Sequence, residues 1–117
     1  MKEKKPMIAV VGPCAAGKST LVSALIELGY SAKHVAQEHS YVPEMWQILV
    51  SPDILIYLDV SFPVSRQRTG STWQESIFNK QISRLTHARE HADLILNTDT
   101  HQPEEILELV KDFLERW

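Results

Sequence analysis

The chain is poor in cysteine and glycine. Cys14 is the only cysteine among 117 residues, which excludes an internal disulfide and a metal site made of cysteines alone. An isolated cysteine is typical of proteins from reducing compartments, so we expect a cytoplasmic protein. Only four glycines occur, and two of them, Gly12 and Gly17, fall in one short stretch. The two glycines indicate that this stretch adopts a specialised backbone conformation.

Excess charge of one sign and long apolar runs are also missing. Twelve basic and fifteen acidic residues give a formal net charge of −3, which argues against a general binder of nucleic acid or membrane surfaces. No apolar run approaches the ~18 residues that would span a bilayer. Hydrophobic residues make up 44% and charged residues 23% of the chain, as in globular proteins. The length predicts one domain, residues 1–117.

Short apolar runs alternate with segments of helical periodicity. We expect strands at 7–11, 32–37, 54–60 and 94–97, and helices at 18–28, 43–50, 63–69, 72–89 and from 103 onwards. The run at 54–60 is apolar almost throughout, which is typical of a parallel strand covered on both faces. Strands that alternate with helices predict an α/β protein with a parallel sheet and right-handed crossovers.

Apolar residues at helical spacing predict which helix faces are buried. Three such faces are expected, formed by Leu21, Val22, Leu25 and Ile26; by Trp73, Ile77, Phe78, Ile82, Leu85 and Ala88; and by Ile106, Leu107, Leu109, Val110, Phe113 and Leu114. Thr72 and Glu75 have the spacing of a capping box at the start of the helix expected at 72–89. Gly29 is expected to end the helix at 18–28.

The two clustered glycines belong to a motif. Gly12-Pro13-Cys14-Ala15-Ala16-Gly17-Lys18-Ser19 has the pattern G-x-x-x-x-G-K-S, and Thr20 follows it. Small residues let the backbone curl around a phosphate, and the helix that follows directs its positive end at the same point. Lys18 would neutralise phosphate oxygens, and Ser19 would place its hydroxyl on Mg²⁺. The alternative is an ordinary glycine-rich turn between a strand and a helix.

With this loop the chain resembles P-loop NTPases, and among them small-molecule kinases of the nucleoside-monophosphate kinase type. The segment at 52–60 resembles the late core strand of thymidylate-kinase-like enzymes. The basic stretch that begins at Arg66 resembles their arginine-bearing lid, and the segment at 92–99 followed by Pro103 resembles their last strand and helix. The resemblance covers most of the chain. It implies a three-layer P-loop NTPase fold that binds ATP.

The chain departs from these kinases in its middle. In that family a monophosphate-binding region and a Walker B strand lie between the second strand and the late core strand. Here only the sixteen residues from Glu38 to Asp53 occupy that place. The resemblance therefore implies that the acceptor-binding region is missing or much reduced. It also implies a mostly parallel sheet of four strands in the order 2-1-3-4, instead of five.

Acidic residues that follow predicted strands are candidates for chemistry. Glu38 follows the second strand, at the edge of the sheet where ligands bind in open α/β proteins. It could order a water on Mg²⁺ or act as a base toward an acceptor, with His39 orienting it; the alternative is a polar loop before the next helix. Asp59 ends the most apolar strand and could hold Mg²⁺; the alternative is a structural role.

Positive charge is concentrated in one part of the chain. From Arg66 to Arg89 there are five basic residues and one acidic residue. Cationic side chains neutralise the charge that develops on a transferring phosphoryl group, so Arg66 or Arg68 is predicted to stabilise the transition state. We expect the part at 66–72 to close over the nucleotide as a lid. The alternative is a solvated helix face.

Other side chains have weaker claims to a function. His87 and His91 lie one helical turn apart and could share a metal ion, but a solvated pair is the simpler interpretation. Tyr41, Met45 and Trp46 could line an acceptor pocket, and packing in the core explains them equally well.

These patterns together predict a protein that binds ATP and Mg²⁺ and transfers a phosphoryl group to a small acceptor. The predicted catalytic residues are Lys18, Glu38, Arg66 and Arg68, and the predicted metal ligands are Ser19 and Asp59. One alternative is a non-catalytic or slowly hydrolysing nucleotide-binding module that acts through a protein partner. A purely structural α/β domain would require the loop motif to be accidental. Neither nucleic acid nor a membrane is expected as a partner.

Overall fold

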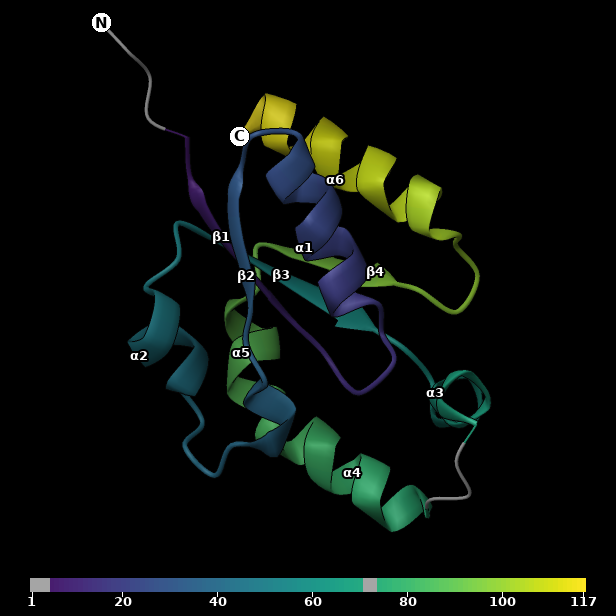
Figure 1. Cartoon of the computed structure of the whole chain (residues 1–117). Coiled ribbons are helices and arrows are strands. Elements are labelled where there is room, and N and C mark those ends of the chain that lie inside the picture. Colours follow the sequence, from purple (N-terminus) through teal and green to yellow (C-terminus); the bar gives the residue numbers. More distant parts are fainter. Residues whose placement is uncertain (1–4, 71–73) are drawn as a thin grey trace, which may run out of the picture.

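A four-stranded parallel sheet lies at the centre of the chain. The computed structural model describes residues 5–70 and 74–117. The strands are β1 (Met7–Val11), β2 (Ser31–His34), β3 (Ile54–Asp59) and β4 (Leu94–Asn97). Their order across the sheet is β2-β1-β3-β4, and all neighbours are parallel (Figure 1). The predicted α/β class, the parallel sheet and the strand order are therefore confirmed.

Helices flank both faces of this sheet. The helices α1 (Lys18–Glu27) and α6 (Pro103–Arg116) lie together on one face, and α2 (Met45–Val50) and α5 (Thr86–His91) lie on the other (Figure 1). The helices α3 (Phe62–Thr69) and α4 (Glu75–Arg84) and the short 3₁₀ helix η1 (Gln37–His39) complete the fold. The helix α4 packs against η1, beyond the carboxyl end of β2. This arrangement brings several connecting segments to one edge of the sheet.

Alternate residues of the two central strands fill two separate cores. Ile8 and Val10 of β1, like Ile54, Ile56 and Leu58 of β3, pack in a cluster with α1 and α6. The residues between them pack in a second cluster, which includes Ala9, Val11, Leu55, Tyr57, Trp46, Leu85 and Ala88. Because successive side chains of a strand point to opposite faces, a strand buried on both sides must be apolar throughout. This is the physical reason for the apolar run at 54–58, which precedes Asp59 at the end of β3.

The long helix expected at 72–89 is divided in two, so that prediction is wrong. The helix α4 ends at Arg84, and α5 begins at Thr86 after Leu85, which has φ −95° and ψ −4°. Phe78 packs in the first core cluster, whereas Leu85 and Ala88 pack in the second. The break at Leu85 lets one segment contribute to both clusters. The expected cap at Thr72 and the expected core residue Trp73 lie outside the described residues.

Other differences from the expected elements are small and have local causes. The second strand ends at His34 instead of residue 37, because Gln37 already begins η1. Ile26, Ile77 and Leu109 are exposed although their spacing predicts burial. They lie at the margins of their apolar stripes, so each stripe is narrower than the sequence suggests. Gly29 follows α1 with φ +93° and ends the helix as expected. Among the described residues, no helix has the length and apolar character needed to cross a bilayer.

Tyr57 leads to a prediction about stability at high pH. Burial and the nearby charge of Asp59 raise the pKa of the Tyr57 hydroxyl from 10.0 to about 12. The unfolded chain then loses this proton at a lower pH than the folded chain, so stability should fall as the pH rises from about 10 toward about 12. We expect wild type to lose about 1.4 kcal/mol more than Tyr57→Phe per pH unit within that window, measured by urea unfolding. Equal losses in both proteins would contradict this account.

Candidate functional site

The loop between β1 and α1 follows a path that only glycine allows at its start. A Cβ on Gly12 would lie 2.2 Å from the carbonyl oxygen of Leu58, far inside van der Waals contact. Gly17 has φ +96° and Ala15 has φ +65°, so the backbone turns through the left-handed region twice before α1 begins. The loop that the sequence singled out is therefore tightly curled and pressed against β3.

The loop is fixed from outside by two buried polar side chains. The Ser65 hydroxyl on α3 donates to the Cys14 carbonyl at 2.8 Å. Gln81 on α4 accepts from the Cys14 N–H at 3.1 Å, and its amide nitrogen donates to the Cys14 sulfur at 3.2 Å. Ser65 and Gln81 are buried, and sequence reasoning identified neither. Gln81 lies three residues after Phe78 and four before Leu85, so its helical spacing could have indicated a buried polar residue.

Lys18 folds back into the loop instead of extending into solvent. Its ammonium donates to the Gly12 carbonyl at 2.5 Å, the Pro13 carbonyl at 3.1 Å and the Glu38 carboxylate at 2.7 Å. The side chain of Lys18 is 10% exposed and that of Glu38 is 5% exposed. The two side chains thus form an ion pair that is largely shielded from water. Removal of either charge would leave the other buried without a partner, which is strongly destabilising. The structure brings together the predicted phosphate-binding lysine and the predicted base.

Glu38 reaches the loop because β1 and β2 end side by side. The N–H of Val35 donates to the Val10 carbonyl at 3.0 Å, which continues the pairing just past the end of β2. The chain then turns through η1, and an Arg84 guanidinium nitrogen donates to the Glu38 carbonyl at 3.3 Å. Glu38 Oε1 is buried and has no hydrogen-bond partner within the described residues. The carboxylate therefore has one paired oxygen and one spare acceptor.

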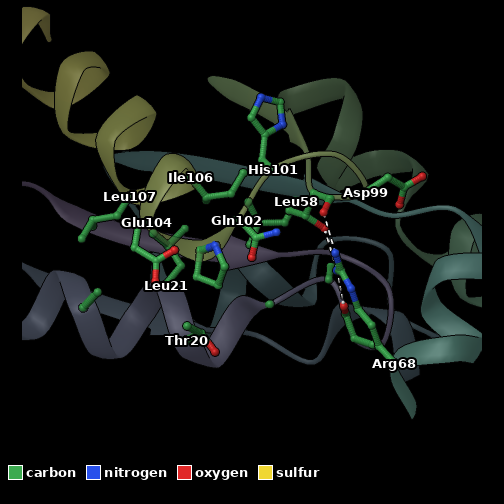
Figure 2. Close-up of a pocket in the computed structure, with 16 residues that line it drawn as sticks. Thr20, Leu21, Leu58, Arg68, Asp99, His101, Gln102, Glu104, Ile106 and Leu107 are labelled. Atoms are coloured by element: carbon green, nitrogen blue, oxygen red, sulfur yellow. Dashed lines mark hydrogen bonds between the residues drawn. The ribbon is translucent and has the colours of Figure 1, made fainter. Parts of the chain in front are cut away.

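A cavity of about 600 Å³ opens beside the loop, between α1 and the start of α6 (Figure 2). Backbone and small side chains of the loop form one wall, and the segment after β4 forms the opposite wall. Its lining includes Ala15, Gly17, Thr20, Leu21, Asp99, Gln102, Ile106 and Leu107. Such a volume and a mixture of apolar and polar walls are typical of small-molecule sites. The positive end of α1 adjoins it, with neither a side-chain cap nor an acid in the first turn.

Arg68 joins the loop to the far wall of this cavity. Its guanidinium donates to the Ala15 carbonyl at 2.9 Å, to the Thr98 hydroxyl at 3.1 Å and to the Thr98 carbonyl at 2.5 Å. Figure 2 shows its side chain reaching toward the cavity from α3. Thr98 is itself buried and donates to the Asp59 carbonyl at 3.1 Å. Arg68 therefore links the two walls of the cavity through its hydrogen bonds to Ala15 and Thr98.

The remaining predicted site residues lie farther from the ion pair or have other partners. Arg66 places its guanidinium 6.0 Å from the ring centre of Phe62 and is exposed. Asp59 accepts from the Val60 N–H at 3.1 Å and lies 3.7 Å from Arg89. Ser19 is exposed in the first turn of α1. The catalytic role of Arg66 and the metal roles of Ser19 and Asp59 stay predictions.

The basic segment is more closely bound to the site than a loose lid would be. Arg68, Arg84 and Arg89 bind the loop, η1 and the end of β3 respectively. They lie on three different helices. Because these cations already have partners, closure of the segment at 66–72 would have to break contacts as well as form them; residues 71 and 72 lie outside the described part.

His87, His91 and Trp46 form an aromatic cluster behind the sheet. The Trp46 indole N–H donates to His87 Nδ1 at 3.2 Å, and the two histidine rings stack with centroids 4.2 Å apart. Trp46 is buried and its backbone N–H donates to Gln37 at 2.8 Å. Packing thus accounts for Trp46, whereas Tyr41 is exposed with the Arg84 guanidinium 4.6 Å from its ring centre.

The path of the loop generates a prediction for its first glycine. Gly12→Ala should cost about 3 kcal/mol of folding free energy, because the new Cβ would overlap a backbone carbonyl that cannot move alone. Gly17→Ala is the matched control: its φ is also positive, but a Cβ there would meet nothing within 4 Å. We expect only about 1–2 kcal/mol for that change. Urea unfolding of both variants measures the difference, and equal losses would refute the close contact.

Neither the family models nor the curated proteins with which the chain was compared match it.

Proposed function

We propose that the chain binds a nucleoside triphosphate with Mg²⁺ and transfers its terminal phosphoryl group to a small acceptor. The observation that carries this proposal is the continuity of the curled loop with the cavity beside it. Loop residues Ala15 to Gly17 form part of the cavity wall. A ligand that filled the cavity with an apolar ring system would hold its anionic end at the loop and at the start of α1.

The chemistry of the loop supports phosphates as that anionic end. The first N–H groups of α1 have no partners within the helix, and its positive end adjoins the loop. Lys18 places a full positive charge at the loop, and its present partners are two carbonyls and one carboxylate. A triphosphate carries more negative charge than Glu38, so it would compete well for the ammonium. Exchange of Lys18 from Glu38 to phosphate would couple binding to release of the carboxylate.

The cavity suits the nucleoside part of such a ligand. Its volume of about 600 Å³ lies within the usual range for bound small molecules. Leu21, Ile106 and Leu107 supply an apolar surface for a base, and Gln102 and Asp99 offer polar groups at the rim. In Figure 2 the Gln102 and Glu104 side chains lie near the apolar wall. These residues favour a nucleotide over inorganic polyphosphate.

Glu38 is the best candidate for a base once Lys18 engages phosphate. A buried carboxylate that loses its cation becomes a stronger proton acceptor, because burial disfavours the charged form. His39 Nε2 lies 3.9 Å from Glu38 Oε2 and could orient it or the acceptor. Ser19 would hold Mg²⁺, which neutralises phosphate charge when bound. Arg68 lies close enough to the loop to act on the phosphates.

A second candidate function is a nucleotide-dependent binding module. It is favoured by the segment that stands where the acceptor region is expected. There α2 presents Ile48 and Leu49, each 64% exposed, and the segment is short. Such a surface suits a protein partner as well as a small acceptor.

Substitution of Lys18 tests nucleotide binding. Because Lys18 is paired with Glu38, the choice of variants must avoid leaving a buried charge without its partner. Lys18→Met alone would leave the Glu38 charge buried without a partner, at a cost of about 3–5 kcal/mol. The comparison is therefore between Glu38→Gln and Lys18→Met/Glu38→Gln. We expect the double variant to bind a non-hydrolysable ATP analogue about 10–150-fold more weakly than Glu38→Gln, since a charge-assisted phosphate contact is worth about 1.5–3 kcal/mol.

Calorimetric titration provides the measurement. Lys80→Met, on the exposed face of α4, is the control for a general loss of positive charge and should bind as wild type does. Equal affinity in the single and double variants would remove Lys18 from nucleotide binding and with it the proposed function.

Transfer of label tests the reaction. Wild type is incubated with Mg²⁺, ATP labelled at its terminal phosphate and a mixture of small metabolites. We expect label in a metabolite, and we expect Glu38→Gln to lower that rate by about 10²–10⁴-fold, as for loss of a general base, while ATP affinity does not fall. Slow release of ADP with no labelled metabolite would favour the binding module. An unchanged rate in Glu38→Gln would remove Glu38 from catalysis.

A further inference from the structure

Three side chains of different chemistry converge at the loop. They are Cys14 in the loop and the neighbours Glu38 and His39 in η1. One ligand atom of each lies within 4.8 Å of the others. The Cys14 sulfur is 3.8 Å from His39 Nε2, and that nitrogen is 3.9 Å from Glu38 Oε2. None of the three lines the cavity beside the loop, and the proposed function does not use the Cys14 sulfur.

We propose that Cys14, Glu38 and His39 form a binding site for a thiophilic divalent cation, with Zn²⁺ as the best fit. Zinc bonds of about 2.3 Å to sulfur and about 2.0–2.2 Å to nitrogen and oxygen place the ligand atoms of a tetrahedral site roughly 3.4–3.6 Å apart. The separations of His39 Nε2 from the Cys14 sulfur and from Glu38 Oε2 exceed that range by a few tenths of an ångström, and the remaining pair lies within 4.8 Å. Small side-chain rotations would complete three of four ligand positions, and the fourth would take water.

The spare oxygen of Glu38 independently favours a cation here. Glu38 Oε1 is buried and lacks a hydrogen-bond partner among residues 5–70 and 74–117. A buried acceptor without a partner is costly, and the cost is larger for a charged group. Lys18 compensates only through Oε2. A divalent ion would give the carboxylate a second cationic partner without requiring that Lys18 leave.

Cys14 is held in place for such a role. Gln81 accepts from the Cys14 backbone N–H and donates to the Cys14 sulfur. The Ser65 hydroxyl donates to the Cys14 carbonyl. Both side chains are buried and come from helices far along the chain. The thiolate is the form of cysteine that binds metal. Gln81 is thus a positioning residue for the sulfur.

The donor set selects the kind of ion. Thiolate and imidazole favour zinc and similar transition metals, whereas Mg²⁺ prefers oxygen ligands alone. Binding would release the thiol proton of Cys14 to solvent. The thiolate and the Glu38 carboxylate would then set two negative charges against the ion and the Lys18 ammonium. His39 is exposed, so the ion can enter from solvent.

Cobalt substitution tests the site directly. Reduced, metal-free wild type is titrated with Co²⁺ without nucleotide, so the result does not depend on nucleotide binding. We expect a thiolate-to-cobalt charge-transfer band and the visible bands of tetrahedral cobalt, both removed by excess Zn²⁺. Cys14→Ser should abolish the charge-transfer band, and His39→Ala should weaken Zn²⁺ binding by at least about tenfold.

Two controls address other sources of binding and a failure to fold. His91→Ala disrupts the other histidine pair, stacked at 4.2 Å, and should leave the cobalt spectrum unchanged. In wild type, equimolar Zn²⁺ should slow alkylation of Cys14, the only thiol, by at least about tenfold, while Mg²⁺ should not. No charge-transfer band in wild type, or alkylation at the same rate with Zn²⁺, would overturn the proposal.

Discussion

The ammonium of Lys18 and the carboxylate of Glu38 meet at 2.7 Å in a place with little access to water. Taking two such charges out of water costs free energy, and their attraction repays it only while both are present and well oriented. The arrangement around the pair follows from this requirement. The loop carbonyls of Gly12 and Pro13 complete the lysine contacts, and the turn after β2 brings the glutamate to them.

Such a pair is also poised for exchange. A strongly anionic ligand can replace the carboxylate as partner of the lysine, and the carboxylate then needs a proton or another cation. The proposed nucleotide site uses the first half of this exchange. In the proposed zinc site the same carboxylate, which has one oxygen without a partner, takes a second cation. Both proposals thus depend on one buried acid.

The frame that holds the loop consists of polar side chains from distant segments. Ser65 and Arg68 come from α3, Gln81 from α4 and Thr98 from the end of β4. Each bonds backbone or sulfur at the carboxyl edge of the sheet, where connecting segments meet. The positive charge concentrated between residues 66 and 89 acts largely in this frame, because three of its arginines bind groups at that edge.

Local pattern by itself determined the α/β class, the parallel sheet and most helices. Alternating apolar runs and helical spacing record burial, and a strand such as β3, covered on both faces, is apolar along its buried length. The motif also predicted the position of the specialised loop, because glycine is required at residue 12, where the backbone lies against the Leu58 carbonyl. Only the tertiary structure decided that Lys18 pairs with Glu38, that Arg68 and not Arg66 contacts the loop, and that the helix after residue 74 breaks at Leu85. Those outcomes depend on contacts between residues far apart in the chain, and neither propensity nor spacing encodes such contacts.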